Sequence, residues 1–328
     1  MTAADPGLVA GFDAGQTHTS CRLARPCPDR PPQEWPVLAS GEGPGVSHLA
    51  APGGEERFRR ALRKSLSQAL AGLGPQPPEL RAAGIGASGI EQGTPVQERG
   101  RAVAAEALGL PGSRVVVTGD ERTALRGAFG AEAGILVISG TGTIAVGQDS
   151  QGRQHRCGGW GWLLDGAGSA HDIGRDGLAL TLRMADGRLP EGPLLPRLWA
   201  ALGLEPTDPL APQRIKALVV AAGFGPADFA RLAPLVEEEA RRGDPGAARI
   251  LECSAQALAE LVAGVAGRLD LQAVAVVGSG GALTHLEGLR SRFLEALADR
   301  LPQAELVEPR ADACGGALAL AAQALRPD

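Results

Sequence analysis

The sequence is poor in several kinds of residue or segment, and most of these shortages exclude a class of protein. It contains no tyrosine and only 3% aromatic residues, which we attribute to a genome-wide bias toward alanine, glycine, proline, leucine and arginine rather than to function. It has no run of roughly 18 or more apolar residues, so no membrane-spanning segment is expected. Positive charge is not in excess either. The net charge of -5 disfavours nucleic acid as a partner, because such binding needs a basic face.

Cysteine is also scarce, and its spacing argues against a disulfide framework or a zinc site. The five cysteines form neither a CxxC pair nor a Cys/His cluster: Cys21, Cys27, Cys157, Cys253 and Cys314. An odd, dispersed set is typical of reduced thiols in a cytoplasmic protein. Residues 1–15 contain neither a basic stretch nor a long apolar stretch, so we expect no signal peptide and a cytoplasmic location.

The chain does contain ample apolar sequence, arranged as strands and helices. Its 328 residues are 44% hydrophobic, which is enough for a sizeable core in two domains or in one large α/β domain. We expect the glycine-rich residues 41–48 to have no regular structure. Over the first 118 residues the apolar spacing predicts three strands, a helix, a strand, a helix and a strand, at 8–12, 20–24, 35–39, 55–73, 80–87, 96–108 and 114–118.

The pattern then begins again, which makes a weak internal repeat. Three strands are predicted at 135–138, 143–147 and 153–157. A helix at 173–188 and a proline-interrupted stretch at 189–212 come next. The remaining predictions are helices at 213–222, 226–242, 245–268 and 286–301, strands at 274–277 and 304–307, and a closing helix from about 314.

Each half begins with a strand that runs into a turn rich in glycine and threonine. The first turn follows Asp13 and contains Gly15, Gln16 and Thr17, and the second consists of Ser139, Gly140, Thr141, Gly142 and Thr143. Backbone N–H groups and hydroxyls in such turns can contact a phosphate, and Asp13 can hold Mg²⁺ directly or through water. An ordinary Asp/Gly turn explains one such motif, but two at corresponding places are less easily explained by chance.

Two further positions at strand ends are candidate functional residues. Asp120 stands between a strand and a helix, where an aspartate is either a helix N-cap or a catalytic base held at the carboxyl end of the strand. The segment Gly278-Ser279-Gly280-Gly281 follows the strand at 274–277 and is typical of a nucleotide site. It is neither a GxGxxG motif nor a P-loop.

These pieces, in this order, resemble a known family. The segments that carry the resemblance are Gly11–Thr17, Thr118–Asp120, Ile138–Thr143, Cys157–Gly161 and Val277–Gly281. Together they are similar to the N-acetylglucosamine kinase branch of the sugar kinase/Hsp70/actin superfamily, also known as the BadF/BadG/BcrA/BcrD ATPase family. The resemblance covers most of the chain and is densest over residues 134–188.

The resemblance implies an α/β fold of two ribonuclease-H-like, actin-like ATPase domains with ATP and Mg²⁺ in the cleft between them. The domains would be residues 1–118, with a C-terminal helix at about 313–328 packing back on them, and residues 119–312, with a helical insertion at about 189–270. The implied activity is ATP-dependent phosphorylation of an amino sugar, N-acetylglucosamine giving its 6-phosphate. A small-molecule sugar would be the partner, without nucleic acid or membrane, in a possible homodimer.

The resemblance also implies a role for each matching residue. Asp120 would be the general base, and Asp13 would hold Mg²⁺. The terminal phosphates would contact the two loops Gly15, Gln16, Thr17 and Ser139, Gly140, Thr141, Gly142, Thr143. The adenosine would lie beside Gly278, Gly280 and Gly281. The sugar would be lined by Ser47, Ser88, Asp120, Gly159, Trp160 and Asp165.

Two departures from the family pattern concern the sugar side. The family usually has asparagine where Ser47 stands, and Gly-Asp-Glu-Gly-Ser where this chain has residues 165–169, Asp-Gly-Ala-Gly-Ser. These differences leave open a different acceptor sugar, or a nucleotide-binding sensor or regulator with altered or lost kinase activity. A third alternative is an activator ATPase of a 2-hydroxyacyl-CoA dehydratase. It is disfavoured because its iron–sulfur cluster needs closely placed cysteines.

Overall fold

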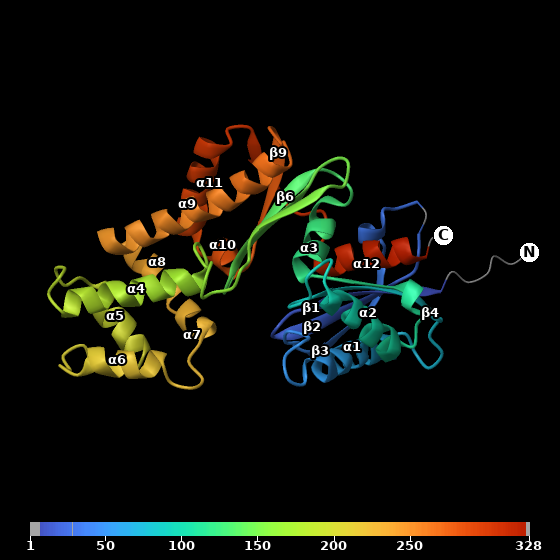
Figure 1. Cartoon of the computed structure of the whole chain (residues 1–328), viewed down its shortest axis with the longest axis horizontal. Coiled ribbons are helices and arrows are strands. Elements are labelled where there is room, and N and C mark those ends of the chain that lie inside the picture. The colour runs from blue at the N-terminus through green and yellow to red at the C-terminus, as the bar shows by residue number, and fades with distance from the viewer. Residues whose placement is uncertain (1–6, 28, 326–328) are drawn as a thin grey trace, which may run out of the picture. The chain divides into compact units, whose positions relative to one another are not determined.

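The computed structural model describes residues 7–27 and 29–325, which fold as two compact units (Figure 1). Unit 1 runs to Glu132 and resumes at Glu308, and unit 2 spans Ala133–Val307. The expected boundary between residues 118 and 119 lies within unit 1. The physical reason is that the helix beginning at Asp120 packs against the C-terminal helix of the same unit.

Unit 1 is built on a five-stranded sheet with the order β3-β2-β1-β4-β5. Strands β1, β2 and β3 are antiparallel neighbours, whereas β4 and β5 run parallel to β1. The carboxyl ends of β1, β4 and β5 therefore meet at one edge of the sheet. The strand bounds are β1 Leu8–Ala14, β2 His18–Ala24, β3 Val37–Pro44, β4 Leu80–Ala87 and β5 Val115–Thr118.

Strand β3 corrects one prediction, because it continues to Pro44 through residues expected to be irregular. Its glycines allow helix α1 (Gly54–Ala71) to lie directly on the strand. A Cβ atom at Gly41 would be 2.2 Å from the Ser65 carbonyl oxygen, and one at Gly43 would be 2.6 Å from that of Ala61. The glycines are thus required by close helix–strand packing rather than by a loop.

Helices α1 and α2 (Pro95–Leu108) pack on the sheet of unit 1, and α3 (Asp120–Phe129) packs on α12 (Ala313–Ala324). Figure 1 shows α12 lying on the side of the sheet opposite to α1. Two short 3-10 helices complete the unit, Pro32–Glu34 and Gly112–Arg114. The order of elements predicted for the first 118 residues is confirmed.

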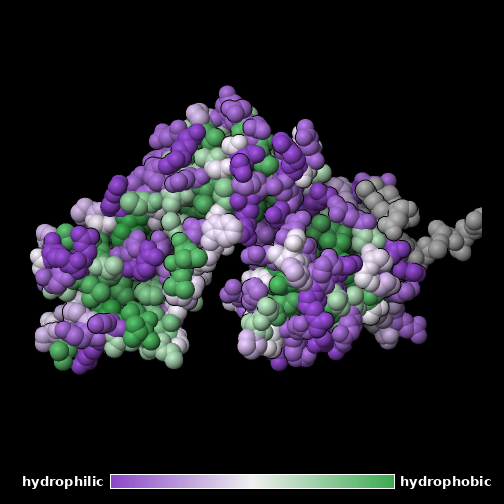
Figure 2. Space-filling view, in the orientation of Figure 1, coloured by the Kyte–Doolittle hydropathy of each residue, from purple (hydrophilic) through white to green (hydrophobic). Residues whose placement is uncertain are grey.

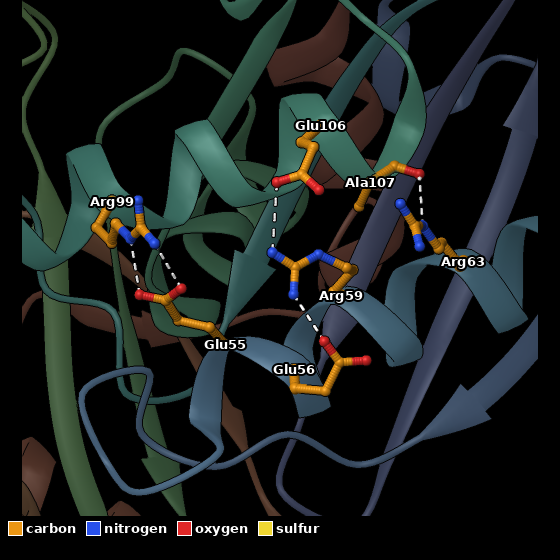
Figure 3. Close-up of polar contacts among 7 residues, drawn as sticks. All are labelled: Glu55, Glu56, Arg59, Arg63, Arg99, Glu106 and Ala107. Atoms are coloured by element: carbon orange, nitrogen blue, oxygen red, sulfur yellow. Dashed lines mark hydrogen bonds and ion pairs between the residues drawn. The ribbon is translucent and has the colours of Figure 1, made fainter.

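Ion pairs connect α1 to α2 on the surface of unit 1 (Figure 3). Arg99 donates to both carboxylate oxygens of Glu55, at 2.7 Å each. Arg59 donates to Glu56 in its own helix at 2.7 Å and to Glu106 of α2 at 3.3 Å. Because every one of these pairs has at least one partner well exposed to water, they orient the two helices rather than contribute strongly to stability.

The sheet of unit 2 repeats the topology of unit 1, with the order β10-β9-β6-β7-β8. Strands β6, β7 and β8 are antiparallel neighbours, and β9 and β10 run parallel to β6. The internal repeat predicted from the two glycine- and threonine-rich turns is therefore confirmed. The strand bounds are β6 Gly134–Ser139, β7 Thr143–Gln148, β8 Gln154–Gly158, β9 Val274–Ser279 and β10 Ala304–Leu306.

Six helices stand between β8 and β9, and three of them (α5, α7 and α8) differ from prediction. The stretch 189–212 contains a helix, α5, because Pro196 lies in its first turn, where a missing N–H does no harm. The helix expected at 226–242 is divided into α7 and α8, with Pro234 in the first turn of α8. The bounds in unit 2 are α4 Ala170–Ala185, α5 Leu194–Ala201, α6 Ala211–Val219, α7 Pro226–Ala230, α8 Ala233–Arg241, α9 Pro245–Arg268, α10 Gly281–His285 and α11 Glu287–Arg300.

Helix α9 is the central helix of unit 2. Its length and composition would allow it to cross a membrane. However, 44% of its most apolar 18-residue segment is buried inside the protein. Leu251, Leu258 and Val262 are fully or almost fully buried in the core beneath the sheet. Its apolar character is thus explained by core packing. Figure 2 shows further apolar surface on the helical part of unit 2, where Leu210 and Val220 beside α6 are exposed.

Candidate active site

Three of the predicted site residues meet at the carboxyl edge of the sheet in unit 1. Asp13 is near the end of β1, Ser88 follows β4, and Asp120 follows β5. Asp13 is paired with Gly86 of β4, and Gly86 is paired with Thr118 of β5. The parallel register of three adjacent strands therefore brings two carboxylates and a hydroxyl to one edge.

Asp120 is held by its own helix and by Ser88. Its Oδ1 accepts the Glu121 backbone N–H at 3.0 Å, and its carboxyl also accepts a hydrogen bond from Ser88. Burial raises the pKa of Asp120 and outweighs these hydrogen bonds. The N-cap position of α3 belongs to Gly119, so Asp120 is not the cap that an aspartate here could have been.

Asp13 lies in a strongly acidic setting. Burial, followed by the charges of Asp120 and Asp312, raises the pKa of Asp13 from 3.8 to about 6, and His18 and Arg22 oppose the rise. Arg22 donates to both carboxylate oxygens of Asp312, one bond being 2.7 Å long. An oxygen-rich edge of this kind favours a bound cation.

The raised pKa of Asp13 predicts how stability depends on pH in protein without nucleotide or metal. The folded state binds this proton more tightly than the unfolded chain, so the stabilisation present below pH ~3.8 is lost as pH rises to about 6. A rise from 3.8 to about 6 corresponds to about 3 kcal/mol. Asp13→Asn should therefore gain up to about that much stability relative to the natural protein between pH ~4 and pH ~7.

Urea unfolding of both proteins at the two pH values measures this difference. Asp186→Asn is the matched control, because Asp186 is an exposed aspartate paired with Arg188. A difference between Asp13→Asn and the natural protein that stays constant with pH would contradict the electrostatic account of Asp13.

The loop Gly15–Thr17 is held in place by backbone hydrogen bonds, and two of its residues are exposed. The Gly15 N–H donates to the His18 carbonyl oxygen at 3.0 Å, which closes the turn, and the Val46 N–H donates to Gly15 at 2.9 Å. A Cβ atom at Gly45 would be 2.0 Å from the Gln16 carbonyl oxygen, so only glycine allows this contact. Gln16 and Thr17 are exposed and available to a ligand.

The two serines assigned to the sugar side also lie in unit 1. The segments that contain them touch, because a Cβ atom at Gly89 would be 2.7 Å from the Cα of His48. The Ser47 hydroxyl accepts a hydrogen bond from Arg57 Nε at 2.8 Å. Ser88 donates to Asp120 and lies 3.5 Å from Gln16 Nε2. Ser88 thereby joins the first loop to the candidate base.

In unit 2 the loop Ser139–Thr143 uses two of its hydroxyls for internal structure. Ser139 Oγ donates to the Gly168 carbonyl oxygen at 2.6 Å, and Thr143 Oγ1 donates to that of Ala167 at 3.2 Å. Thr141 and Gly142 are exposed. The backbone of the loop and the Thr141 hydroxyl are therefore what it offers to a phosphate, and Ser139 and Thr143 attach the loop to residues 166–170.

The segment Gly278–Gly281 lies against this loop. Gly280 has φ of 89°, and a Cβ atom there would be 2.4 Å from the Ser139 carbonyl oxygen. Gly281 is the first residue of helix α10. A Cβ atom at Gly140 would lie 4.0 Å from the backbone N atom of Gly281. The structure thus brings together two glycine-rich segments that are about 140 residues apart in the sequence, as parallel pairing of β6 with β9 requires.

The remaining predicted sugar residues follow strand β8. Gly158 and Gly159 both have positive φ, which turns the chain sharply before Trp160. The Trp160 ring is 62% exposed, and the Arg156 guanidinium lies 4.4 Å from the ring centroid. Asp165 is half-buried, with its N–H donating to the Gly161 carbonyl oxygen at 2.8 Å.

Sequence reasoning missed three residues of these two regions. Arg22 and Asp312 form their ion pair across 290 positions, and Asp312 also caps α12 by accepting the Gly315 N–H. His171 is 1% exposed beneath residues 158–169. No local pattern marks Arg22 or His171, because their importance comes from tertiary packing. A DxxG capping signal before the last helix was the one clue to Asp312.

Comparison with known proteins shows which proteins this chain resembles. It is 28% identical over 319 residues to the N-acetylmuramic acid/N-acetylglucosamine kinase of Clostridium acetobutylicum, covering 95% of this chain and 97% of the relative. It is 31% identical over 196 residues to the N-acetyl-D-glucosamine kinase of Dictyostelium discoideum, covering 57% and 59%.

A solved structure supports the fold. The crystal structure from Chromobacterium violaceum, provisionally named an N-acetylglucosamine kinase, matches with a TM-score of 0.75 and 27% identity over 97% of this chain and 99% of that one. The predicted α/β fold of two ribonuclease-H-like units is therefore confirmed. The model of the BadF/BadG/BcrA/BcrD ATPase family matches residues 10–321. The chain therefore belongs to the BadF/BadG/BcrA/BcrD ATPase family.

Proposed function

We propose that this protein is an ATP-dependent kinase of an amino sugar, converting N-acetylglucosamine to its 6-phosphate. The observation that carries the proposal is the meeting of Asp13, Ser88 and Asp120 at one sheet edge, next to the exposed loop Gly15–Thr17. Family membership supports the use of ATP, and the names of the relatives support an amino sugar. A cytoplasmic location and a homodimer stay predictions.

Asp13 suits a role in holding Mg²⁺. Magnesium prefers oxygen ligands and is commonly held by one or two carboxylates together with substrate phosphates and water. Within the described residues no group of three or more His, Cys, Asp or Glu side chains could hold a metal by itself. Asp13, with its pKa raised by burial and then by neighbouring acids, fits the shared arrangement. When bound, Mg²⁺ would neutralise charge on the transferring phosphoryl group.

Asp120 would take the proton from the sugar hydroxyl. A general base works best when its pKa is near the working pH, and burial moves the pKa of Asp120 in that direction. Ser88 and the Glu121 N–H hold the carboxylate in one orientation. Phosphoryl transfer needs little else from the protein than positioning and charge stabilisation.

The two glycine-rich segments of unit 2 would bind the nucleotide. The backbone of Ser139–Thr143 would contact phosphate, as would Gly15, Gln16 and Thr17 of unit 1, and Gly278, Gly280 and Gly281 would approach the adenosine. Glycine allows the main chain to come close to a ligand without a side chain in the way. On the sugar side we assign Ser47, Ser88, Gly159, Trp160 and Asp165.

A coupled assay of ADP release tests the proposal. The purified protein is supplied with ATP and Mg²⁺ and, in turn, with N-acetylglucosamine, glucosamine, N-acetylmannosamine and glucose. We expect stimulated turnover, highest with an amino sugar. Absence of stimulation by every sugar, in folded protein that binds ATP, would reject the kinase and favour the nucleotide-binding sensor suggested by the altered residues 165–169.

A further inference from the structure

Arg57 is a half-buried arginine near the start of α1 whose positive charge has no acidic partner. Its side chain is nevertheless held in place, because Nε donates to Ser47 Oγ at 2.8 Å and Nη2 donates to the Pro52 carbonyl oxygen at 2.7 Å. No ion pair joins it to a carboxylate among the described residues, whereas Arg59 and Arg99 each pair with a glutamate (Figure 3). A fixed guanidinium with an unpaired charge is suited to binding an anion.

The polar groups that remain unused around Arg57 are hydrogen-bond donors. The Ser47 hydroxyl accepts from Arg57, and its own O–H donates to no group in the part of the chain that the structure describes. Nη1 of Arg57 has no acceptor there either. Gly53 has no side chain that could cover Nη1, since a Cβ atom at Gly53 would lie 3.2 Å from it. Two donors, a hydroxyl and a guanidinium, therefore remain for a ligand that accepts two hydrogen bonds, and a carboxylate does so with its two oxygens.

The neighbours of Ser47 place this pair of donors beside the candidate active site in unit 1. The Val46 N–H donates to the Gly15 carbonyl oxygen of the first loop at 2.9 Å. On the other side, a Cβ atom at Gly89 would lie 2.7 Å from the Cα of His48. Since consecutive Cα atoms are ~3.8 Å apart, Ser47 lies one residue from contacts both with the first loop and with the segment that follows β4.

We propose that Arg57 and the Ser47 hydroxyl bind a carboxylate carried by the acceptor sugar, so that the protein prefers an acidic amino sugar to a neutral one. The proposal rests on the proposed sugar kinase activity and names the class of its substrate. The acid must be attached away from C6, because the 6-hydroxyl has to stay free to receive the phosphoryl group. A carboxylic acid joined through an ether to another ring hydroxyl meets this requirement.

The charges around the sheet edge explain why a substrate carboxylate would need Arg57. The edge already holds Asp13, Asp120 and Asp312, whose charges act on one another. Arg22 does not compensate a further acid, because Asp312 already binds it. A carboxylate brought to this edge would be repelled unless a second cation met it, and Arg57 is a cation without an acidic partner. One guanidinium and one hydroxyl match the single charge and two oxygens of a carboxylate better than the charge of a phosphate dianion.

The test compares calorimetric binding of an acidic sugar with binding of its neutral ester. The probes are N-acetylmuramic acid, which is N-acetylglucosamine with a lactic acid ether on O3, and its methyl ester. We expect the natural protein to bind the acid about tenfold or more tightly than the ester, because hydrogen bonds to a charged group are strong. Arg57→Gln should bring the ratio of the two affinities to about one. Arg60→Gln is the matched control, since Arg60 is an exposed arginine of the same helix, and it should keep the natural ratio.

The ratio separates a lost carboxylate contact from a general loss of sugar binding, which weakens the acid and the ester equally. Equal affinity for both in the natural protein needs no variant and would overturn the proposal, as would a natural ratio in Arg57→Gln. Weaker ATP binding in Arg57→Gln with the ratio retained would assign the guanidinium to a nucleotide phosphate instead. Phosphorylation of N-acetylglucosamine by a protein without preference for the acid would leave the kinase standing and reject the carboxylate site. Failure to bind any of the three sugars would reject both.

Discussion

Asp120→Asn is expected to lower kcat by about 10²- to 10⁴-fold while leaving the KM for ATP nearly unchanged. Asparagine keeps the size of the side chain and can still accept the Glu121 N–H and the Ser88 hydroxyl, so the edge of the sheet should retain its structure. The amide cannot accept the proton of a sugar hydroxyl. The loss should therefore fall on the chemical step and not on nucleotide binding.

Steady-state kinetics with saturating sugar measures this effect, and a nucleotide-binding titration confirms that the variant still binds ATP. Asp186→Asn is a suitable control, because it makes the same chemical change at an exposed aspartate. A variant at position 120 with natural turnover would show that another group, or water, receives the proton.

Gly316→Val should destabilise the protein by at least about 3 kcal/mol. A Cβ atom at Gly316 would lie 1.9 Å from the Thr123 carbonyl oxygen and 2.5 Å from the Gly127 N atom. Both atoms belong to the backbone of α3, so no rotation of a side chain relieves the overlap. Helix α12 would have to move away from α3, and α3 begins at Asp120. We therefore expect a loss of activity together with the loss of stability.

Chemical denaturation followed by circular dichroism measures the change in unfolding free energy. Gly267→Val provides the comparison, because it adds the same side chain to a helix where no atom beyond the local helix backbone lies within 4 Å of the Cβ position. Equal stability of the two variants would mean that α12 and α3 are not packed as described.

The residues at strand ends were predictable because each follows an apolar run. Asp13, Asp120 and the turn at Ser139 stand where a buried strand leaves the core, and parallel strands end at a common edge. The repeat of two similar halves followed from the same pattern. Local sequence is sufficient to predict these strand ends and turns, because strand propensity and turn chemistry act over a few residues.

Features that depend on distant packing were not predictable. Gly41 and Gly43 signalled a loop, yet they lie in β3, because α1 needs the space that a side chain would fill. The hydroxyls of Ser139 and Thr143 looked free for phosphate, yet they bond carbonyl groups 29 and 24 residues away. His171 carried no signal because its surroundings come from Trp162 and Phe229.

The identity of the product tests the central claim most directly. N-acetylglucosamine is incubated with ATP, Mg²⁺ and the protein, and the sugar is examined by phosphorus–proton correlation NMR. The account predicts a phosphate coupled to the two C6 protons, formed by the natural protein and lost in Asp120→Asn. ATP binding without any phosphorylated sugar, or equal product from the Asp120→Asn variant, would contradict it.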